Sequence, residues 1–408
     1  MNRLADHRRI GRELNIFATE EQCGSGLPFW LPAGASIRRE LENFIIDLER
    51  RNGYHHVNTP VMAKRDLYER SGHWEHFREE MYPPMPLGSE QLVLRPMLCP
   101  HHILIYDQQP RNWRDLPLRL AEVGSMFRYE RSGVVGGLSR VRQMTLNDGH
   151  VFCSAENVVD EIKTILAMVQ EAYRALHIPA PRLRLSRGGK GPKYASDPAL
   201  WQQSEAMLRQ ALECAELPFF EAEGEAAFYG PKIDLQVSDP QGREETLSTV
   251  QLDLLLPERF GLRYEQDDQR HRPVIVHRSI ISTMERMVAH LLEVHNGALP
   301  PWLSPTQVIV LPASSDGNGY AAMVKDQLAG HGLRVELDTR DATLGARVRA
   351  AQQRKIPYLA VVGQREEHSQ TISVRLRDGH QLAPVAVAEF KDSARRVIDT
   401  RDHRLLET

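Results

Sequence analysis

The sequence predicts an α+β unit with an antiparallel sheet over residues 1–303, followed by a small α/β unit over residues 304–408. Two strand patterns between residues 119 and 153 are joined by a polar, glycine-rich loop, and consecutive strands joined in this way are antiparallel. Helical patterns interleave with further strands up to residue 293, as in α+β proteins. After the breaker-rich stretch GALPPWLSPTQ, short apolar strands alternate with helices, which favours a mostly parallel α/β arrangement.

In the first unit, apolar residues recur at helical spacing from Ile37 to Asn52, where Asn-Gly is a stop signal. The segment 54–62 is expected to be a strand broken by Pro60. Further helices are predicted over Asn157–Leu176, Trp201–Leu212 and His277–Glu293, and further strands over 226–238 and 245–256. In the second unit the strands are QVIVLPA, RVELDT, PYLAVVG and TISVRLR, and the helices are Tyr320–His331 and Thr343–Arg354.

Size and composition restrict the class of protein. A chain of 408 residues is too long for one ordinary core, so two domains are expected. No apolar run approaches 18 residues and the start is polar, so we expect a cytoplasmic protein with no membrane partner. The net charge of −3 means that any RNA contact must come from local basic patches. The four scattered cysteines include no CxxC pair and favour no disulfide.

Four arginines, Arg128, Arg140, Arg142 and Arg286, fall inside otherwise apolar patterns. Arginine is well suited to hold the oxygens of a polyphosphate in a fixed orientation. A buried arginine without a partner is costly, so each of the four needs an anion or an acid nearby. Internal salt bridges are the open alternative.

Cys99, His150 and His277 each adjoin apolar residues, and one thiolate with two imidazoles could bind zinc with a fourth position open. The alternative is a small buried cysteine and two ordinary core histidines. The segment SRGGKGPK at 186–193 has the wrong spacing for a phosphate loop, so we expect no nucleotide there.

Several motifs, in this order along the chain, resemble threonyl-tRNA synthetases, which are class II aminoacyl-tRNA synthetases. The helix and strand ending at Pro60 are similar to the first class II motif, FRYE at 127–130 with its loop to Arg140 to the second, and STMER at 282–286 to the third. Segments that point to the threonine family are RSGHW at 70–74, FYGPKID at 228–234, STVQLDLLLPERF at 248–260 and VHRS at 276–279. The resemblance covers essentially the whole chain, from DHRRIGREL onward.

The resemblance implies a class II catalytic domain over 1–303 and an anticodon-binding domain over 304–408, without the family's N-terminal editing domain. It implies ATP-dependent activation of L-threonine, with Mg²⁺ accompanying ATP, and transfer to tRNA(Thr). It further implies a homodimer formed through the first motif, and Glu366 and Arg375 match family positions that read anticodon bases.

The resemblance also implies residue roles. Cys99, His150 and His277 would hold one Zn²⁺ per chain, which would coordinate the amino and hydroxyl groups of threonine. A site that binds the hydroxyl rejects isosteric valine, so zinc would be a selector and not a generator of a nucleophile. The residues that would contact threonine are Met97, Asp148, Tyr229 and Gln251. Arg128 would stabilise the α-phosphate of ATP, Arg140 and Arg286 the terminal phosphates, Glu130 and Gln251 would hold the nucleotide, and His73 would assist deprotonation of the tRNA ribose.

The chain departs from the family pattern at several of these motifs. Gly136 replaces histidine, Leu146-Asn147 replaces Gln-Asp, Ser282 replaces glycine, and the run NCPGH reads LCPHH at 98–102. Met144 replaces the aromatic residue that stacks on adenine, which should weaken ATP binding without abolishing it. Three functions therefore stay open: a working ligase, as an extra or inhibitor-resistant copy; a paralogue acting on a non-tRNA acceptor; and an inactive RNA-binding regulator.

Overall fold

The computed structural model describes residues 5–190 and 198–406. Its largest element is an eight-stranded sheet of order β10-β9-β11-β12-β15-β8-β7-β3. The strands are β3 (His55–His56), β7 (Leu118–Phe127), β8 (Gln143–Cys153), β9 (Arg182–Arg187), β10 (Phe219–Glu223), β11 (Lys232–Ser238), β12 (Glu244–Asp253) and β15 (Val274–Ser279). All neighbours from β9 to β7 are antiparallel, and only the two edge pairs are parallel. The predicted antiparallel sheet is confirmed.

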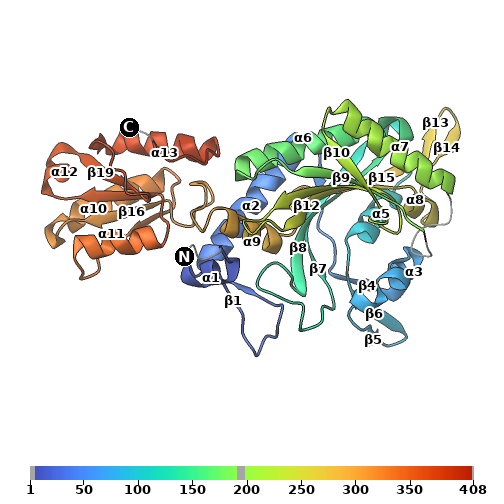
Figure 1. Cartoon of the computed structure of the whole chain (residues 1–408), viewed down its shortest axis with the longest axis horizontal. Coiled ribbons are helices and arrows are strands. Elements are labelled where there is room, and N and C mark those ends of the chain that lie inside the picture. Colours follow the sequence, from blue (N-terminus) through green and yellow to red (C-terminus); the bar gives the residue numbers. More distant parts are fainter. Residues whose placement is uncertain (1–4, 191–197, 407–408) are drawn as a thin grey trace.

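Helices cover both faces of this sheet (Figure 1). They are α2 (Pro32–Arg51), α5 (Cys99–Asp107), α6 (Val158–Leu176), α7 (Pro198–Cys214) and α9 (Met284–Val294), and α1 (His7–Glu13) packs against α9. The main core lies on the α6 side, where Ile162, Ile165 and Val169 pack under alternate strand residues such as Val151 and Val276. On the opposite face α5 packs with Leu120, Phe152 and Ile275. Alternate side chains along the strands therefore point into the main core on one face of the sheet and toward α5 on the other.

Three predicted boundaries in this unit are wrong. Residues 277–279 belong to strand β15, and helix α9 begins only at Met284, because the whole run Val274–Ser279 is buried between β12 and β8. The expected strand 54–62 is reduced to His55–His56, with β4 starting at Met62, since proline cannot donate to a strand ladder. The strand expected from residue 226 begins at Lys232.

Smaller elements surround the main sheet. A three-stranded sheet, β4 (Met62–Lys64), β6 (Glu90–Leu94) and β5 (Met85–Leu87), lies with α3 (Arg65–Arg70) beside the α5 face. The other short elements are β1 (Phe17–Ala18), β2 (Phe29–Trp30), α4 (His73–His76), α8 (Leu255–Arg259), β13 (Tyr264–Gln266) and β14 (Gln269–His271).

The second unit has a five-stranded sheet of order β17-β16-β18-β19-β20. Its strands are β16 (Val308–Pro312), β17 (Val335–Leu337), β18 (Tyr358–Val362), β19 (Thr371–Leu376) and β20 (Val385–Ala386), and its helices are α10 (Asn318–Gly330), α11 (Leu344–Gln353), α12 (Gln364–Ser369) and α13 (Val387–Asp399). The first three strands are parallel, as predicted, whereas β19 and β20 run antiparallel. Helices α10 and α13 pack on one face and α11 on the other.

The two units lie side by side along the long axis of the molecule (Figure 1). Polar and aromatic contacts join them. Arg334 of the second unit pairs with Glu40 of α2 at 2.7 Å and donates to the carbonyl of Trp302 at 2.6 Å. The guanidinium of Arg401 lies 4.7 Å from the ring centroid of Phe44. Within the described part of the chain, no helix is both long and apolar enough to cross a membrane.

Candidate active site

A cleft of about 310 Å³ opens on the α5 face of the eight-stranded sheet. Side chains from β8, β11, β12 and β15 line it, and the start of α9 closes one end. The predicted site residues on its wall are Met97, Cys99, Arg128, Asp148, Tyr229, Gln251, His277 and Arg286. The antiparallel sheet thus brings together residues from widely separated motifs.

Cys99, His150 and His277 form a buried cluster at one end of the cleft, with their ligand atoms within 4.8 Å of one another. His150 and His277 are direct partners on β8 and β15, and Cys99 begins α5. His150 Nδ1 lies 2.8 Å from His102 Nδ1, and His277 Nε2 lies 2.9 Å from Asp253 Oδ2. One ring nitrogen of each histidine is therefore left over, and His150 Nε2 has no hydrogen-bond partner in the described structure.

The chemistry of this cluster fits a soft divalent cation. Burial raises the pKa of the Cys99 thiol, and the carboxylates of Asp148 and Asp253 raise it further. Burial lowers the pKa of His150, with His277 and His102 adding to the effect. A cation would stabilise the thiolate that these surroundings disfavour, and a thiolate with two neutral imidazoles is a donor set that zinc prefers.

A chain of hydrogen bonds crosses the floor of the cleft. Tyr229 Oη donates to Gln251 Oε1 at 2.6 Å, Gln251 Nε2 donates to Thr249 Oγ1 at 3.2 Å, and Thr249 lies 3.4 Å from Asp234 Oδ1. The Tyr229 ring also stacks on His277, with centroids 5.0 Å apart. Five further polar side chains line the cleft although their sequence context predicted no role for them: Lys232, Asp234, Thr246, Ser248 and Thr249. Most of them lie in FYGPKID and STVQLDLLLPERF, so the signal was present in segments already singled out.

Arg128 and Arg286 face the cleft without a carboxylate at ion-pair distance among the described residues. Arg128 makes one weak side-chain contact in the described structure, from Nη2 to Met97 Sδ at 3.8 Å. Desolvation lowers the pKa of Arg286, Glu245 opposes this effect, and the charges of Arg128 and Arg140 lower the pKa further. Two guanidinium groups that destabilise each other's charge are suited to share an anion.

The other two arginines have protein partners. Arg140 pairs with Glu130 at 2.8 Å, and neither side chain lines the cleft. Arg142 donates to the carbonyls of Glu130 at 2.9 Å and Ser25 at 3.1 Å. Arg140 therefore forms the internal salt bridge that was the alternative to phosphate binding. Arg142 is held by backbone carbonyls instead.

His73 lies behind the wall of the cleft. Its Nδ1 is 2.8 Å from Ser71 Oγ, and its Nε2 is buried without a partner in the described structure. The ring is 5.8 Å from Phe228, which is 4.9 Å from Tyr229 on the wall. Burial lowers the pKa of His73 to about 3, so the ring is neutral at physiological pH. One aromatic layer separates it from the cleft.

The departures from the family pattern lie in several parts of the fold. Met144 and Leu146 line the cleft beside Met97 and Met126, so apolar side chains form this part of its wall. Asn147 points away from the cleft. Its Nδ2 donates to Glu49 Oε1 at 2.7 Å, and its Oδ1 accepts from the Ile280 amide at 3.1 Å.

Ser282 precedes α9 with a φ of 62°, in the left-handed region that favours glycine. The family's glycine at this position therefore has a conformational reason, and the serine of this chain is strained.

The predicted anticodon residues lie in the second unit. Glu366 Oε1 accepts from Ser373 Oγ at 2.9 Å, and Glu366 Oε2 accepts from the Gly363 amide at 3.0 Å. Arg375 is two residues beyond Ser373 on β19, so the two share a face of the strand. The structure thus places Glu366 and Arg375 near one another. In the glycine-rich segment 186–193, residues 191–193 lie outside the described residues.

Comparison with known proteins finds two family models along the chain. Residues 86–295 match the class II core domain of the G, H, P, S and T tRNA synthetases, and residues 307–396 match an anticodon binding domain. The first match covers the metal-type cluster as well as Arg128 and Arg286.

Curated relatives include the threonine–tRNA ligases of Enterococcus faecalis, 49% identical over 95% of this chain, and of Lactiplantibacillus plantarum, 51% identical over 95%. This chain spans 61% and 60% of the lengths of those relatives. Among solved structures, a domain of threonyl-tRNA synthetase from Cryptosporidium parvum is 34% identical with a TM-score of 0.92, and covers 96% of this chain and 98% of its own. A threonyl-tRNA synthetase structure from Aeropyrum pernix is 25% identical, with a TM-score of 0.83 and 98% of each chain covered.

Proposed function

Because this chain belongs to the threonyl-tRNA synthetases of class II, we propose that it activates L-threonine with ATP and transfers it to tRNA(Thr). The observation that carries the proposal is one cleft in which Arg128 and Arg286 have no acidic partner among the described residues, while Cys99, His150 and His277 converge a short distance away. An anion site beside a metal-type site suits an ATP phosphate next to a small amino acid. The named relatives are ligases, which gives no support to a non-tRNA acceptor or an inactive regulator.

The three-residue cluster would hold one Zn²⁺ per chain, which when bound would supply Lewis-acid recognition of the threonine amino and hydroxyl groups. Asp148, on the wall beside the cluster, would accept the hydroxyl hydrogen. Tyr229 and Met97 would enclose the methyl side, and the hydrogen bond from Tyr229 would keep Gln251 oriented. Valine would leave these polar groups unpaired, and such a loss discriminates strongly.

The chain's own part in activation would be binding and charge stabilisation. Arg128 would neutralise charge that develops on the α-phosphate while the threonine carboxylate attacks, and Arg286 would hold the terminal phosphates together with Arg140, which must leave Glu130 to do so. Mg²⁺ would accompany ATP. The roles of Glu130 in holding the nucleotide and of His73 in the transfer step stay predictions.

We further propose a homodimer through α2 and β3, because β3 is the edge strand of the main sheet. Glu366 and Arg375 would contact the anticodon. The boundary between the catalytic and anticodon-binding domains at residues 303 and 304, and the cytoplasmic location, stay predictions.

Threonine-dependent ATP–pyrophosphate exchange tests the activity. We expect exchange with threonine and far less with valine, and tRNA(Thr) charging in the same preparation. Arg128→Ala should reduce exchange by at least about a hundredfold, since removal of one charge-stabilising donor costs that much in rate. Arg209→Ala is the matched control, because this arginine is bound to Glu221 on the surface. Absence of exchange with every amino acid would overturn the proposal, and exchange without charging would favour a non-tRNA acceptor.

Metal analysis tests the zinc assignment. We expect about one zinc per chain in the wild-type protein, and Cys99→Ala should lose the metal and threonine activation together. Cys153→Ala is the control, since Cys153 is buried in the main core outside the cluster. Unchanged metal content in Cys99→Ala would refute the assignment.

A further inference from the structure

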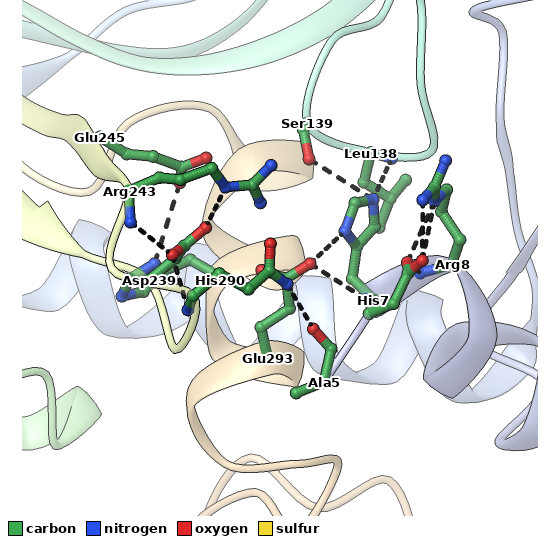
Figure 2. A network of polar contacts seen from close by, with 12 residues as sticks. Ala5, His7, Arg8, Leu138, Ser139, Asp239, Arg243, Glu245, His290 and Glu293 are labelled. Atoms are coloured by element: carbon green, nitrogen blue, oxygen red, sulfur yellow. Dashed lines mark hydrogen bonds and ion pairs between the residues drawn. The ribbon is translucent and has the colours of Figure 1, made fainter. Parts of the chain in front are cut away.

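The loop 131–142 between β7 and β8, which carries Arg140, is tied to the rest of the protein by His7 (Figure 2). His7 is the first residue of α1 and is 6% exposed. A cleft of about 570 Å³ opens beside this contact and is lined by His7, Gly136 and Ser139. His7 and its polar contacts therefore hold the loop at the rim of an open cleft.

The hydrogen-bond partners assign the tautomer of His7. The backbone amide of Leu138 lies 3.2 Å from His7 Nε2, and an amide N–H can only donate. Nε2 must therefore accept, which leaves the ring hydrogen on Nδ1, where Glu293 Oε1 is 2.7 Å away. The same carboxylate oxygen accepts from the His7 backbone amide at 3.1 Å. His7 thus joins the loop to Glu293 as a neutral ring with a defined orientation.

Gly137 permits this contact. A Cβ at Gly137 would lie 2.2 Å from His7 Nε2, and the residue has a φ of 53°. Any side chain at this position would push the imidazole off the loop.

The tethered amide is rigidly connected to Arg140. The Gly136 amide donates to the Arg140 carbonyl at 3.0 Å, and the Ser139 amide donates to the Gly136 carbonyl at 3.1 Å. The Leu138 side chain is fully buried in the main core. A shift of the Leu138 amide would therefore move the backbone of Arg140.

The other end of the tether is α9, because Glu293 lies near the end of that helix and Arg286 lies near its start. We propose that His7 is a positioning residue that fixes the loop arginine, Arg140, relative to Arg286 for binding of the ATP phosphates. This inference rests on the proposed function. It assigns to α1, which lies outside the cleft, a role in the geometry of the nucleotide site.

A cation site at this place is disfavoured, although Asp6, His7 and Glu293 bring ligand atoms within 4.8 Å. The Asp6 carboxylate is already bound by Arg8 Nε at 3.0 Å and Nη2 at 2.8 Å, and Glu293 Oε1 accepts two hydrogen bonds from His7. Both carboxylates are therefore engaged with protein donors.

Two substitutions of His7 test its contact with the Leu138 amide separately from its contact with Glu293. His7→Asn keeps a donor near Glu293 but has no acceptor at the position of Nε2, whereas His7→Gln can present its carbonyl oxygen to the Leu138 amide. In threonine-dependent ATP–pyrophosphate exchange, His7→Asn should raise the KM for ATP about tenfold, the usual effect of leaving a buried amide unpaired. The KM for threonine should change less than about twofold, and His7→Gln should stay within about threefold of wild type.

Hydrogen–deuterium exchange of the loop gives a second readout that does not depend on activity. The amides of 131–142 should exchange faster in His7→Asn and not in His7→Gln. Gly137→Ala, which keeps His7 but displaces its ring, should behave like His7→Asn and serves if that variant does not fold. Arg9→Gln is the control, because Arg9 pairs with Glu13 on the same helix and has no hydrogen bond to the loop among the described residues.

Equal KM values for ATP in the asparagine and glutamine variants would overturn the proposal, as would unchanged loop exchange in both His7→Asn and Gly137→Ala. Wild-type protein without pyrophosphate exchange would instead overturn the proposed function, and amide exchange would still decide whether His7 holds the loop.

Discussion

Asn147 illustrates how one residue can depart from a family motif for a structural reason. Its amide donates to Glu49 Oε1, which also lies 2.6 Å from Arg278 Nη1. All three side chains are fully buried or nearly so. An aspartate at this position would put a second carboxylate against Glu49, whose basic neighbours are Arg278 and, at 3.0 Å, His56, so asparagine is the residue that suits Glu49.

We therefore expect Asn147→Asp to lower the free energy of unfolding by about 3 kcal/mol, because it adds an uncompensated buried charge. Urea denaturation monitored by circular dichroism measures the effect. Adding Glu49→Gln to Asn147→Asp should recover at least half of the loss, since one carboxylate would again face Arg278 and an amide. Wild-type stability in Asn147→Asp would contradict the pairing.

At Ser282, in contrast, we expect a substitution that raises the free energy of unfolding. Its φ of 62° costs an L-residue about 1 kcal/mol relative to glycine. Ser282→Gly should therefore raise the unfolding free energy by up to about 1 kcal/mol, less the entropy that glycine gains in the unfolded chain. Ser279→Gly, in strand β15, should lower stability under the same denaturation protocol. A lower melting temperature in Ser282→Gly would show that the serine side chain makes a contact stronger than the strain.

At the scale of elements, α1 is too short to be stable alone. It has seven residues, an Asp6 cap that accepts from the Arg8 amide at 2.8 Å, and a buried side against α9. The side-chain bond from Arg8 lowers the pKa of Asp6 to about 2, although partial burial opposes the effect. Asp6 therefore caps α1 through a hydrogen bond from the Arg8 amide and an ion pair with the Arg8 side chain. This cap stabilises the helix that carries His7.

This shift predicts how the stability due to the cap depends on pH. The folded pKa lies below the usual value of 3.8, so the stabilisation by Asp6 is complete above about pH 5 and is lost as the pH falls from 4 toward 2. The difference in urea midpoint between wild type and Asp6→Ala should be constant above pH 5 and shrink below pH 4. In an Arg8→Ala background the pH dependence of that difference should largely vanish. A difference that persists unchanged at pH 2 would exclude the ionic contribution.

For the whole molecule, the contacts between the two units place the second unit relative to the cleft. Arg334, the residue before β17 of the second unit, pairs with Glu40 and donates to the carbonyl of Trp302 in the first unit. Amino acid activation uses only the first unit in the proposed function, whereas tRNA charging uses both. A variant that loses these contacts between the units should therefore charge tRNA less efficiently while its activation of the amino acid is unchanged.

We expect Arg334→Met to lower kcat/KM for tRNA(Thr) charging by about tenfold, the effect of losing one or two buried charged hydrogen bonds. Threonine-dependent pyrophosphate exchange should stay within about twofold of wild type. Arg340→Met is the control, because Arg340 pairs with Asp338 inside the second unit. Equal charging by the two variants would mean that the contacts between the units do not orient the tRNA-binding surface.

The predictions from sequence succeeded where the signal is local. The alternation of β7 and β8, the apolar side of α6 and the parallel strands β16, β17 and β18 follow from residue spacing, which a regular backbone converts directly into buried faces. They failed at the start of α9, because a continuous apolar run has no period that separates a buried strand from a helix.

By itself the sequence determined the α+β and α/β units, the family resemblance and the residue types of the cleft, because these depend on spacing and motifs along the chain. Only the tertiary structure decided which arginines form ion pairs. Arg140 pairs with Glu130, whereas Arg128 and Arg286 have no carboxylate partner among the described residues. It also revealed that His7 reaches Leu138, 131 residues away. Partners of this kind are set by how helices and strands pack, and packing brings together residues whose separation in sequence carries no signal.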